Sequence, residues 1–167
     1  MIEGVLGGFI AAGCFLMFLH QLRPKIQLAP VVAKRVTDNG AIYSIKIVNN
    51  GARNIVKIEA ELESVRVRNI PNGFTRTAQT IELKKSSLLF LSKYEHSEIE
   101  DKGTYRFTTN ENLCELFEES EDNFLRFRVF AIDEMSNFGK LYSSEYKIHR
   151  NAIVEGDFEH GKSLKIV

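Results

Sequence analysis

A run of fifteen residues without a charge, residues 5–19, most constrains how this chain can fold. Extended to residues 4–22, it has only His20 and Gln21 as polar members, and as a helix it would span roughly 28 Å. That length matches the hydrocarbon core of a bilayer, about 30 Å. An amphipathic core helix would show a polar face, and a signal peptide would begin with basic residues. The pattern therefore predicts a retained transmembrane anchor over residues 1–22.

Small residues recur along this segment at a spacing of four. Gly4, Gly8 and Ala12 would share one face of a helix, where they let a second helix approach closely. Glycine is also common in membrane helices that do not associate. We expect this face to support helix–helix association and a homo-oligomer.

The charges that flank the span predict its orientation. Glu3 precedes it, whereas Arg23, Lys25, Lys34 and Arg35 follow it. Basic residues concentrate on the cytoplasmic side, so we expect a cell-membrane protein whose C-terminal domain is cytoplasmic. The four cations are expected to contact anionic lipid headgroups, which makes the membrane the first predicted partner.

Composition is that of an ordinary globular domain, with 44% hydrophobic and 26% charged residues. The zero net charge conceals an asymmetry: residues 23–85 carry a net charge of +7, and residues 95–122 carry −8. A neutral chain gives little support to nucleic-acid binding. Cys14 lies in the apolar run and Cys114 in the domain, so no disulfide within the domain is expected.

Alternating hydrophobicity and turn residues predict a mainly β domain. The expected strands are residues 31–37, 41–49, 56–63, 88–91, 105–109, 124–133 and 141–149. The inward-facing sets in the two clearest strands are Val56, Ile58, Ala60 and Leu62, and Leu125, Phe127, Val129 and Ala131. The alternation changes phase after residue 63, which predicts a β-bulge near Glu63 and Ser64 or a change of sheet. Short strands with turns between them are typical of a β-sandwich or barrel.

The chain offers little catalytic chemistry. Residues 156–163 match the phosphate-binding pattern G-x-x-x-x-G-K-S, but that chemistry needs a helix after the loop. Residues 164–167 show no helical pattern, so we expect an accidental match. The histidines lack metal-ligand spacing, so no metal, cofactor or catalytic residue is predicted.

The chain resembles the inner helix and cytoplasmic β-sandwich of inward-rectifier potassium channels. The resemblance rests on Gly-Cys-Phe at 13–15 with Arg-Pro-Lys at 23–25, on segments within 31–60, and on residues 144–146 and 153–158. It implies an immunoglobulin-like (E-set) sandwich, possible assembly around an axis, and lipid contact at Arg23 and Lys25. The chain lacks the T-V-G-Y-G-type filter, so alone it cannot be a selective potassium channel.

These observations predict a transmembrane anchor (1–22), a basic juxtamembrane linker (23–30) and a cytoplasmic β-sandwich (31–167). The expected function is a non-enzymatic binding or assembly module at the cytoplasmic membrane face. The alternative is an oligomeric pore-forming or channel-gating subunit regulated by a ligand or by lipid. Neither the ligand nor a protein partner can be inferred from the sequence.

Overall fold

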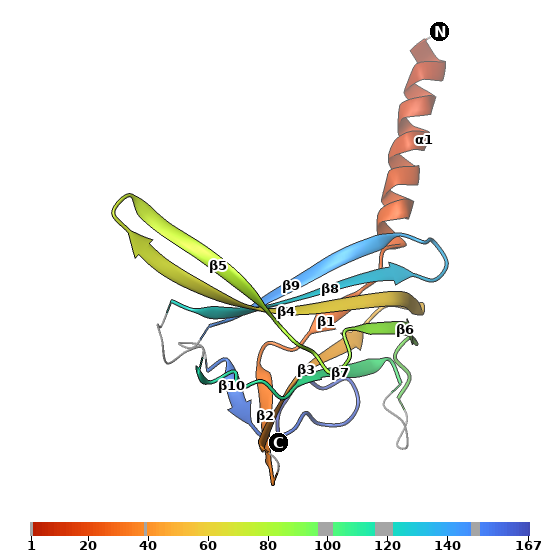
Figure 1. Cartoon of the computed structure of the whole chain (residues 1–167). Coiled ribbons are helices and arrows are strands. Elements are labelled where there is room, and N and C mark those ends of the chain that lie inside the picture. Colours follow the sequence, from red (N-terminus) through yellow and green to blue (C-terminus); the bar gives the residue numbers. More distant parts are fainter. Residues whose placement is uncertain (1, 39, 97–101, 116–121, 148–150) are drawn as a thin grey trace.

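The computed structural model shows a mainly β chain that begins with a long helix (Figure 1). The structure describes all residues except 1, 39, 97–101, 116–121 and 148–150, and it does not describe the side chains of residues 2–7, 9, 19 and 20. The elements are α1 (Ile2–Gln21), β1 (Ile26–Leu28), β2 (Val32–Thr37), β3 (Gly40–Asn49), β4 (Ile55–Ile70), β5 (Gly73–Ile81), β6 (Ser87–Leu91), β7 (Thr104–Thr109), β8 (Phe124–Asp133), β9 (Gly139–Lys147) and β10 (Ile153–Glu155). The predicted mainly β class is confirmed.

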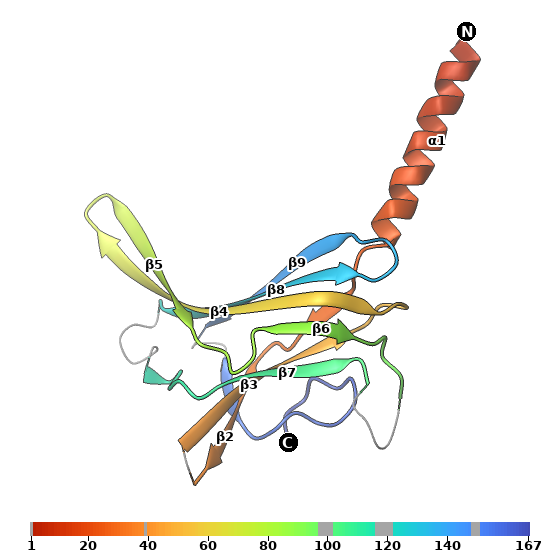
Figure 2. The same cartoon turned by 45° about the vertical axis from the view of Figure 1, so that its right-hand side comes forward.

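Helix α1 covers most of the predicted anchor and rises away from the strands (Figures 1 and 2). It ends three residues before Pro24, which cannot donate the next helical hydrogen bond. Its described apolar side chains are exposed, among them Ile10, Phe15, Leu16, Met17 and Phe18. Within the described part of the chain, no helix combines the length and the hydropathy of a candidate membrane span.

The first sheet, sheet A, is built around β3. Strands β1 and β2 lie end to end along one edge of β3, β7 pairs with the other edge, and β10 joins β2 in parallel. Strand β1 lies within residues 23–30, which the sequence predicts as a linker. Its three residues are too few to show an alternating pattern, and pairing of Ile26 with Asn49 of β3 is what makes them a strand.

The second sheet, sheet B, is built around the sixteen-residue strand β4. Strands β5 and β6 lie along one edge of β4, and β8 followed by β9 along the other. The predicted bulge near Glu63 and Ser64 is wrong, because pairing with both neighbours is continuous there. The irregularity lies between Val56 and Glu59, where Lys57 adopts a φ of 50°. An extra residue there realigns the buried positions of β4 with the core.

The core lies between the two sheets. The four residues predicted to face inward on β8 are all fully buried, as are Ile58 and Leu62 of β4. From sheet A, Phe107 meets Phe127 with ring centroids 5.7 Å apart. Each such large apolar side chain contributes about 1.5 to 3 kcal/mol by leaving water, so this layer holds the sheets together.

The C-terminal segment, residues 156–167, folds back over the outer face of sheet A. The backbone groups of Asp157 and Val167 exchange two hydrogen bonds, at 3.0 and 2.9 Å. Phe158 is buried against Ala29 and Ala33, with Leu164 and Ile166 around it. This second, smaller apolar cluster explains why the outer face of sheet A is partly closed to solvent.

Candidate functional site

The junction between α1 and the β domain is the first candidate site. Backbone carbonyls at a helix C-terminus lack partners within the helix. Here the carbonyl of Gln21 accepts from the Arg53 guanidinium at 3.5 Å, and that of Leu22 from the Ser136 hydroxyl at 2.9 Å. Just beyond the helix, the Pro24 carbonyl accepts from the Tyr142 hydroxyl. The domain therefore holds the end of α1 through three side chains from different parts of the sequence.

Asp133, the last residue of β8, organises the turn that makes these contacts. Its carboxylate accepts from Arg53 Nε at 2.8 Å and from the backbone N–H groups of Met135 and Ser136 at 3.1 and 2.9 Å. Burial opposes ionisation, but the hydrogen bonds from Ser136 and Arg53 outweigh it and hold the pKa of the Asp133 carboxyl below its usual value. Asp133 therefore remains ionised, and its negative charge lies next to the residues that contact the end of α1.

The structure separates the four predicted headgroup contacts into two pairs. Arg23 and Lys25 are exposed just beyond the end of α1. Lys34 and Arg35 lie on β2, at the end of the domain opposite α1 in both views (Figures 1 and 2). They form ion pairs of 3.9 Å with Glu155 and 3.0 Å with Asp157, respectively. Only Arg23 and Lys25 therefore lie where a bilayer around α1 would begin.

The predicted helix–helix face lies on α1. Gly8 and Ala12 are exposed, and a Cβ added at Gly8 would meet no heavy atom within 4 Å. The surroundings of Gly4 lie outside the described residues. Residues four apart share a helix face, so Gly8 and Ala12 present a strip of small residues, and no described atom lies within 4 Å of a Cβ built at Gly8.

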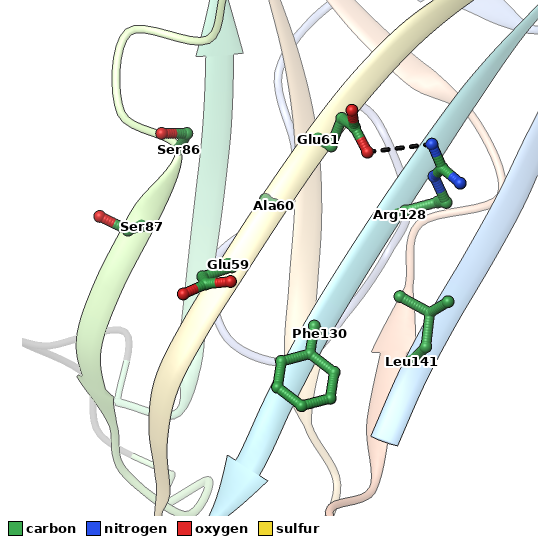
Figure 3. A pocket seen from close by; sticks show the side chains of 8 residues that line it. All are labelled: Glu59, Ala60, Glu61, Ser86, Ser87, Arg128, Phe130 and Leu141. Carbon is green, nitrogen blue, oxygen red and sulfur yellow. Dashed lines mark ion pairs between the residues drawn. The ribbon is translucent and has the colours of Figure 1, made fainter. Parts of the chain in front are cut away.

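A groove on the outer face of sheet B is the second candidate site (Figure 3). Its volume is about 590 Å³, and it lies across β4, β8 and β9 beside the start of β6. The polar lining includes Glu59, Glu61, Ser86 and Ser87, and the apolar side is formed by Phe130 and Leu141. Two carboxylates beside an aromatic and an aliphatic side chain suit a partner segment with a basic and an apolar residue.

A ladder of ion pairs borders the groove. Arg128 contacts Glu61 at 3.0 Å and Glu63 at 2.7 Å, and Arg126 contacts Glu145 at 3.3 Å. These residues lie opposite one another on β4, β8 and β9. Because Arg128 already faces two carboxylates, the groove does not suit an anion, and its own carboxylates, Glu59 and Glu61, lie 4.0 Å from Lys57 and 3.0 Å from Arg128, respectively.

The segment that matches the phosphate-binding pattern, residues 156–163, contacts a cation of this chain instead of an anion. Lys46 of β3 is fully buried, and its ammonium group donates to the carbonyl oxygens of Glu159 at 2.6 Å and Gly161 at 2.5 Å. The segment thus presents carbonyl oxygens to a cation, whereas a phosphate site needs N–H donors. No helix follows Ser163 in the described residues.

Cys114 belongs to a small polar cluster between β3 and the segment after β7. The buried Tyr43 hydroxyl donates to Asn112 Oδ1 at 3.0 Å and lies 3.3 Å from Cys114 Sγ. Burial, and then the hydrogen bond with Cys114, raise the pKa of the Tyr43 hydroxyl above its ordinary value. Among the described residues, no three His, Cys, Asp or Glu side chains lie close enough to hold a metal.

Sequence reasoning missed the residues that fix α1 to the domain. Nothing in the pattern connects Arg53, Asp133, Ser136 and Tyr142, since they come from separate loops and strands.

The charged border of the groove, in contrast, is partly indicated by the sequence. Glu61 and Glu63 alternate along one strand and Arg126 and Arg128 along another, which is the pattern of facing charges on paired strands.

Comparison with known proteins leaves the family open. No protein-family model and no curated protein sequence match the chain. Among solved structures, it is similar to the crystal structure of the sporulation control protein Spo0M from Bacillus subtilis, with a TM-score of 0.40 and 11% sequence identity. The match covers 73% of this chain and 47% of the Spo0M chain, so this chain spans about half the length of that protein. No functional conclusion follows from a similarity of this size.

Proposed function

We propose that this protein is a single-pass membrane protein whose β domain works at the cytoplasmic face as a non-enzymatic binding and assembly module. One observation carries the proposal: a continuous twenty-residue helix, uncharged after Glu3, projects from the domain with its described apolar side chains exposed. Soluble monomers rarely expose apolar surface of this extent, because leaving it in water is unfavourable. A bilayer would bury it.

The position of the basic residues supports the orientation. Arg23 and Lys25 are exposed next to the end of α1, where they would meet anionic headgroups on the cytoplasmic side. Lys34 and Arg35 are not part of this proposal, because they lie at the far end of the domain and face acidic partners. The groove on sheet B is the proposed binding surface, and Gly4, Gly8 and Ala12 are the proposed assembly surface.

The proposal includes a relationship to the immunoglobulin-like E-set domains of inward-rectifier channels. Two sheets packed face to face around a common core support it, as does the direct connection from the helix through Pro24 to the first strand. In the channels that the chain resembles, the inner helix is followed by the cytoplasmic sandwich, so this relationship would make the junction between α1 and the domain important for function.

A carbonate wash of membranes tests the anchor. The full chain is expected to stay in the membrane pellet, and the double variant Phe15→Arg, Leu16→Arg to be released, since each arginine opposes insertion by about 2.5 to 3.5 kcal/mol. The matched control is Leu89→Arg, Phe90→Arg, which changes two exposed apolar residues of β6 and should leave the pellet fraction unchanged. Release of the unaltered chain would refute the anchor.

The hydrogen-bonded junction between α1 and the domain favours a second candidate, a channel-gating subunit. Because Arg53, Ser136 and Tyr142 hold the helix end directly, movement of the domain would be transmitted to α1. Planar-bilayer recording of the reconstituted full chain tests this. Conductance that disappears in a Tyr142→Phe variant supports gating through the junction, and a sealed bilayer with the unaltered chain rejects it.

A further inference from the structure

The β4–β5 hairpin extends well beyond the sandwich. Strands β4 and β5 pair without interruption from Leu62 opposite Ile81 to Ile70 opposite Gly73. Only the inner part of this hairpin contacts the core, and every residue of β5 except Ile81 is exposed. The hairpin therefore projects as a two-stranded arm, which the first figure shows rising from the end of the sheet away from α1 (Figure 1).

The tip of this arm is both apolar and cationic. Phe74 is 61% exposed and Ile70 49% exposed, although side chains of this size normally find cover. The guanidinium carbon of Arg76 lies 5.0 Å from the centre of the Phe74 ring. Residues 65–80 contain three arginines and no acidic residue, in a chain whose overall net charge is zero. The arm thus concentrates positive charge beside two exposed apolar side chains.

The arm and α1 lie on the same side of the domain. In both views the tip rises to the level of the lower end of α1, while sheet A lies below (Figures 1 and 2). A bilayer that surrounds α1 would therefore have its headgroup region at the height of the tip. The turn between β8 and β9 lies beside the base of α1 and exposes Met135, which is 80% accessible.

We propose that the tip of the β4–β5 hairpin is a second membrane contact, which places Phe74 and Ile70 among the headgroups of an anionic bilayer. The inference rests on the proposed anchoring of α1. Aromatic rings favour the membrane–water interface, and Arg68 and Arg76 are positioned to meet lipid phosphates. Two apolar side chains are too few for a stable protein interface of about 800 Å² per partner, whereas insertion into headgroups needs no larger surface.

This second contact would fix the orientation of the domain. A domain held to a single helix can still rotate about the helix axis and tilt with the helix in the bilayer, whereas a second, separated contact fixes its orientation relative to the membrane. The outer face of sheet B, which carries the groove, lies between α1 and the arm (Figure 1).

Single-tryptophan variants test the contact directly, because the chain contains no tryptophan. Three variants of the full chain are reconstituted: Phe74→Trp at the tip, Met17→Trp near the end of α1, and Leu89→Trp on β6. The vesicles contain phosphatidylcholine and phosphatidylserine, with or without phosphatidylcholine brominated near the headgroup end of its acyl chains. Leu89 is 91% exposed and serves as the matched control for tryptophan's own affinity for interfaces.

We expect the bromine to quench Phe74→Trp and Met17→Trp and to leave Leu89→Trp unchanged. Quenching of Met17→Trp alone would overturn the hairpin contact and leave the anchor intact. Loss of quenching at Met17→Trp alone would overturn the anchor and leave the hairpin as a lipid contact. A blue-shifted Phe74→Trp emission that bromine does not reduce would place the tip against protein, such as a second copy, and would also overturn the inference.

A charge-reversed background tests the cationic half of the proposal. Arg68→Glu and Arg76→Glu, added to Phe74→Trp, are expected to abolish its quenching, because acidic side chains are repelled by phosphatidylserine. The same two changes added to Met17→Trp should leave its quenching unchanged. Undiminished quenching of the charge-reversed Phe74→Trp chain would show that the arginines do not contribute.

Discussion

Arg53 donates from its Nε to a carboxylate oxygen of Asp133 at 2.8 Å, and its terminal nitrogen reaches the carbonyl of Gln21. The pair joins the loop before β4 to the end of β8, eighty positions apart in the sequence. Because Asp133 also orders the turn that carries Ser136, one buried carboxylate supports two of the three contacts with the end of α1. The attachment of the helix therefore depends on a charge.

Because the attachment depends on this charge, the effect of Asp133→Asn on the free energy of unfolding should vary with pH. A carboxyl whose pKa is depressed on folding stabilises the protein above its unfolded pKa, about 3.9, and this contribution is lost as the pH falls through the lower folded value. We expect the variant to lower the free energy of unfolding by about 2 kcal/mol at neutral pH, with the difference shrinking below about pH 4. Urea titrations of the detergent-solubilised chain at several pH values measure it.

The control for that profile is Asp157→Asn. Asp157 also faces two arginines, Arg35 and Arg106, but its side chain is 37% exposed. Solvent screening makes such pairs weak, so we expect only a small change in the free energy of unfolding at neutral pH. An Asp133→Asn difference that persists unchanged into acid would contradict the proposed role of its charge.

A second stability prediction concerns the hydrogen bonds that Lys46 donates to the C-terminal segment. Replacing it by methionine keeps most of the buried volume but leaves the carbonyls of Glu159 and Gly161 without this donor. We expect Lys46→Met to destabilise the chain by about 3 kcal/mol and to increase amide hydrogen exchange in residues 157–167. Lys93→Met, at an exposed lysine, is the control and should change neither quantity. Unchanged exchange in Lys46→Met would show that the segment is held by its apolar contacts alone.

The oligomeric state tests the small-residue face of α1. Gly8→Leu puts a large side chain on the strip shared by Gly8 and Ala12, whereas Gly13→Leu puts the same side chain on a different face. We expect the full chain to sediment as an oligomer in mild detergent, Gly8→Leu to reduce its mass to that of a monomer, and Gly13→Leu to leave it unchanged. Equal masses for all three chains would remove this face from the proposal.

Gly139 controls the shape of the groove on sheet B. A Cβ at this position would lie 2.5 Å from Phe130 Cζ, so the ring must move. Because the ring is a side-chain end and can rotate, we expect Gly139→Ala to cost only about 1 kcal/mol. NMR should show shifted resonances for Phe130 and Leu141 and unchanged ones for the core residue Leu125. Shifts that extend to Leu125 would mean that the ring is coupled to the core.

The alternating patterns anticipated much of the fold. Residues 125, 127, 129 and 131 lie buried as expected, because period-two hydrophobicity directly records which face of a strand is covered. The predicted position of the bulge is wrong because a lysine gives no indication of the positive φ that Lys57 adopts. The change in the alternation after residue 63 indicated a bulge at a different position of the same strand. Strand β1 was missed because its existence depends on the edge of β3 rather than on its own three residues.

The sequence by itself determined properties that are local: an uncharged helical segment, basic residues after it, and strands whose faces differ in polarity. These depend on side-chain chemistry at neighbouring positions, which is readable without knowing the fold. Only the tertiary structure decided which distant residues meet. Lys46 and Glu159 are 113 positions apart, yet the buried ammonium group of Lys46 donates a hydrogen bond to the backbone carbonyl of Glu159. The same packing separated Lys34 and Arg35 from Arg23 and Lys25, because β2 runs to the end of the domain away from the helix.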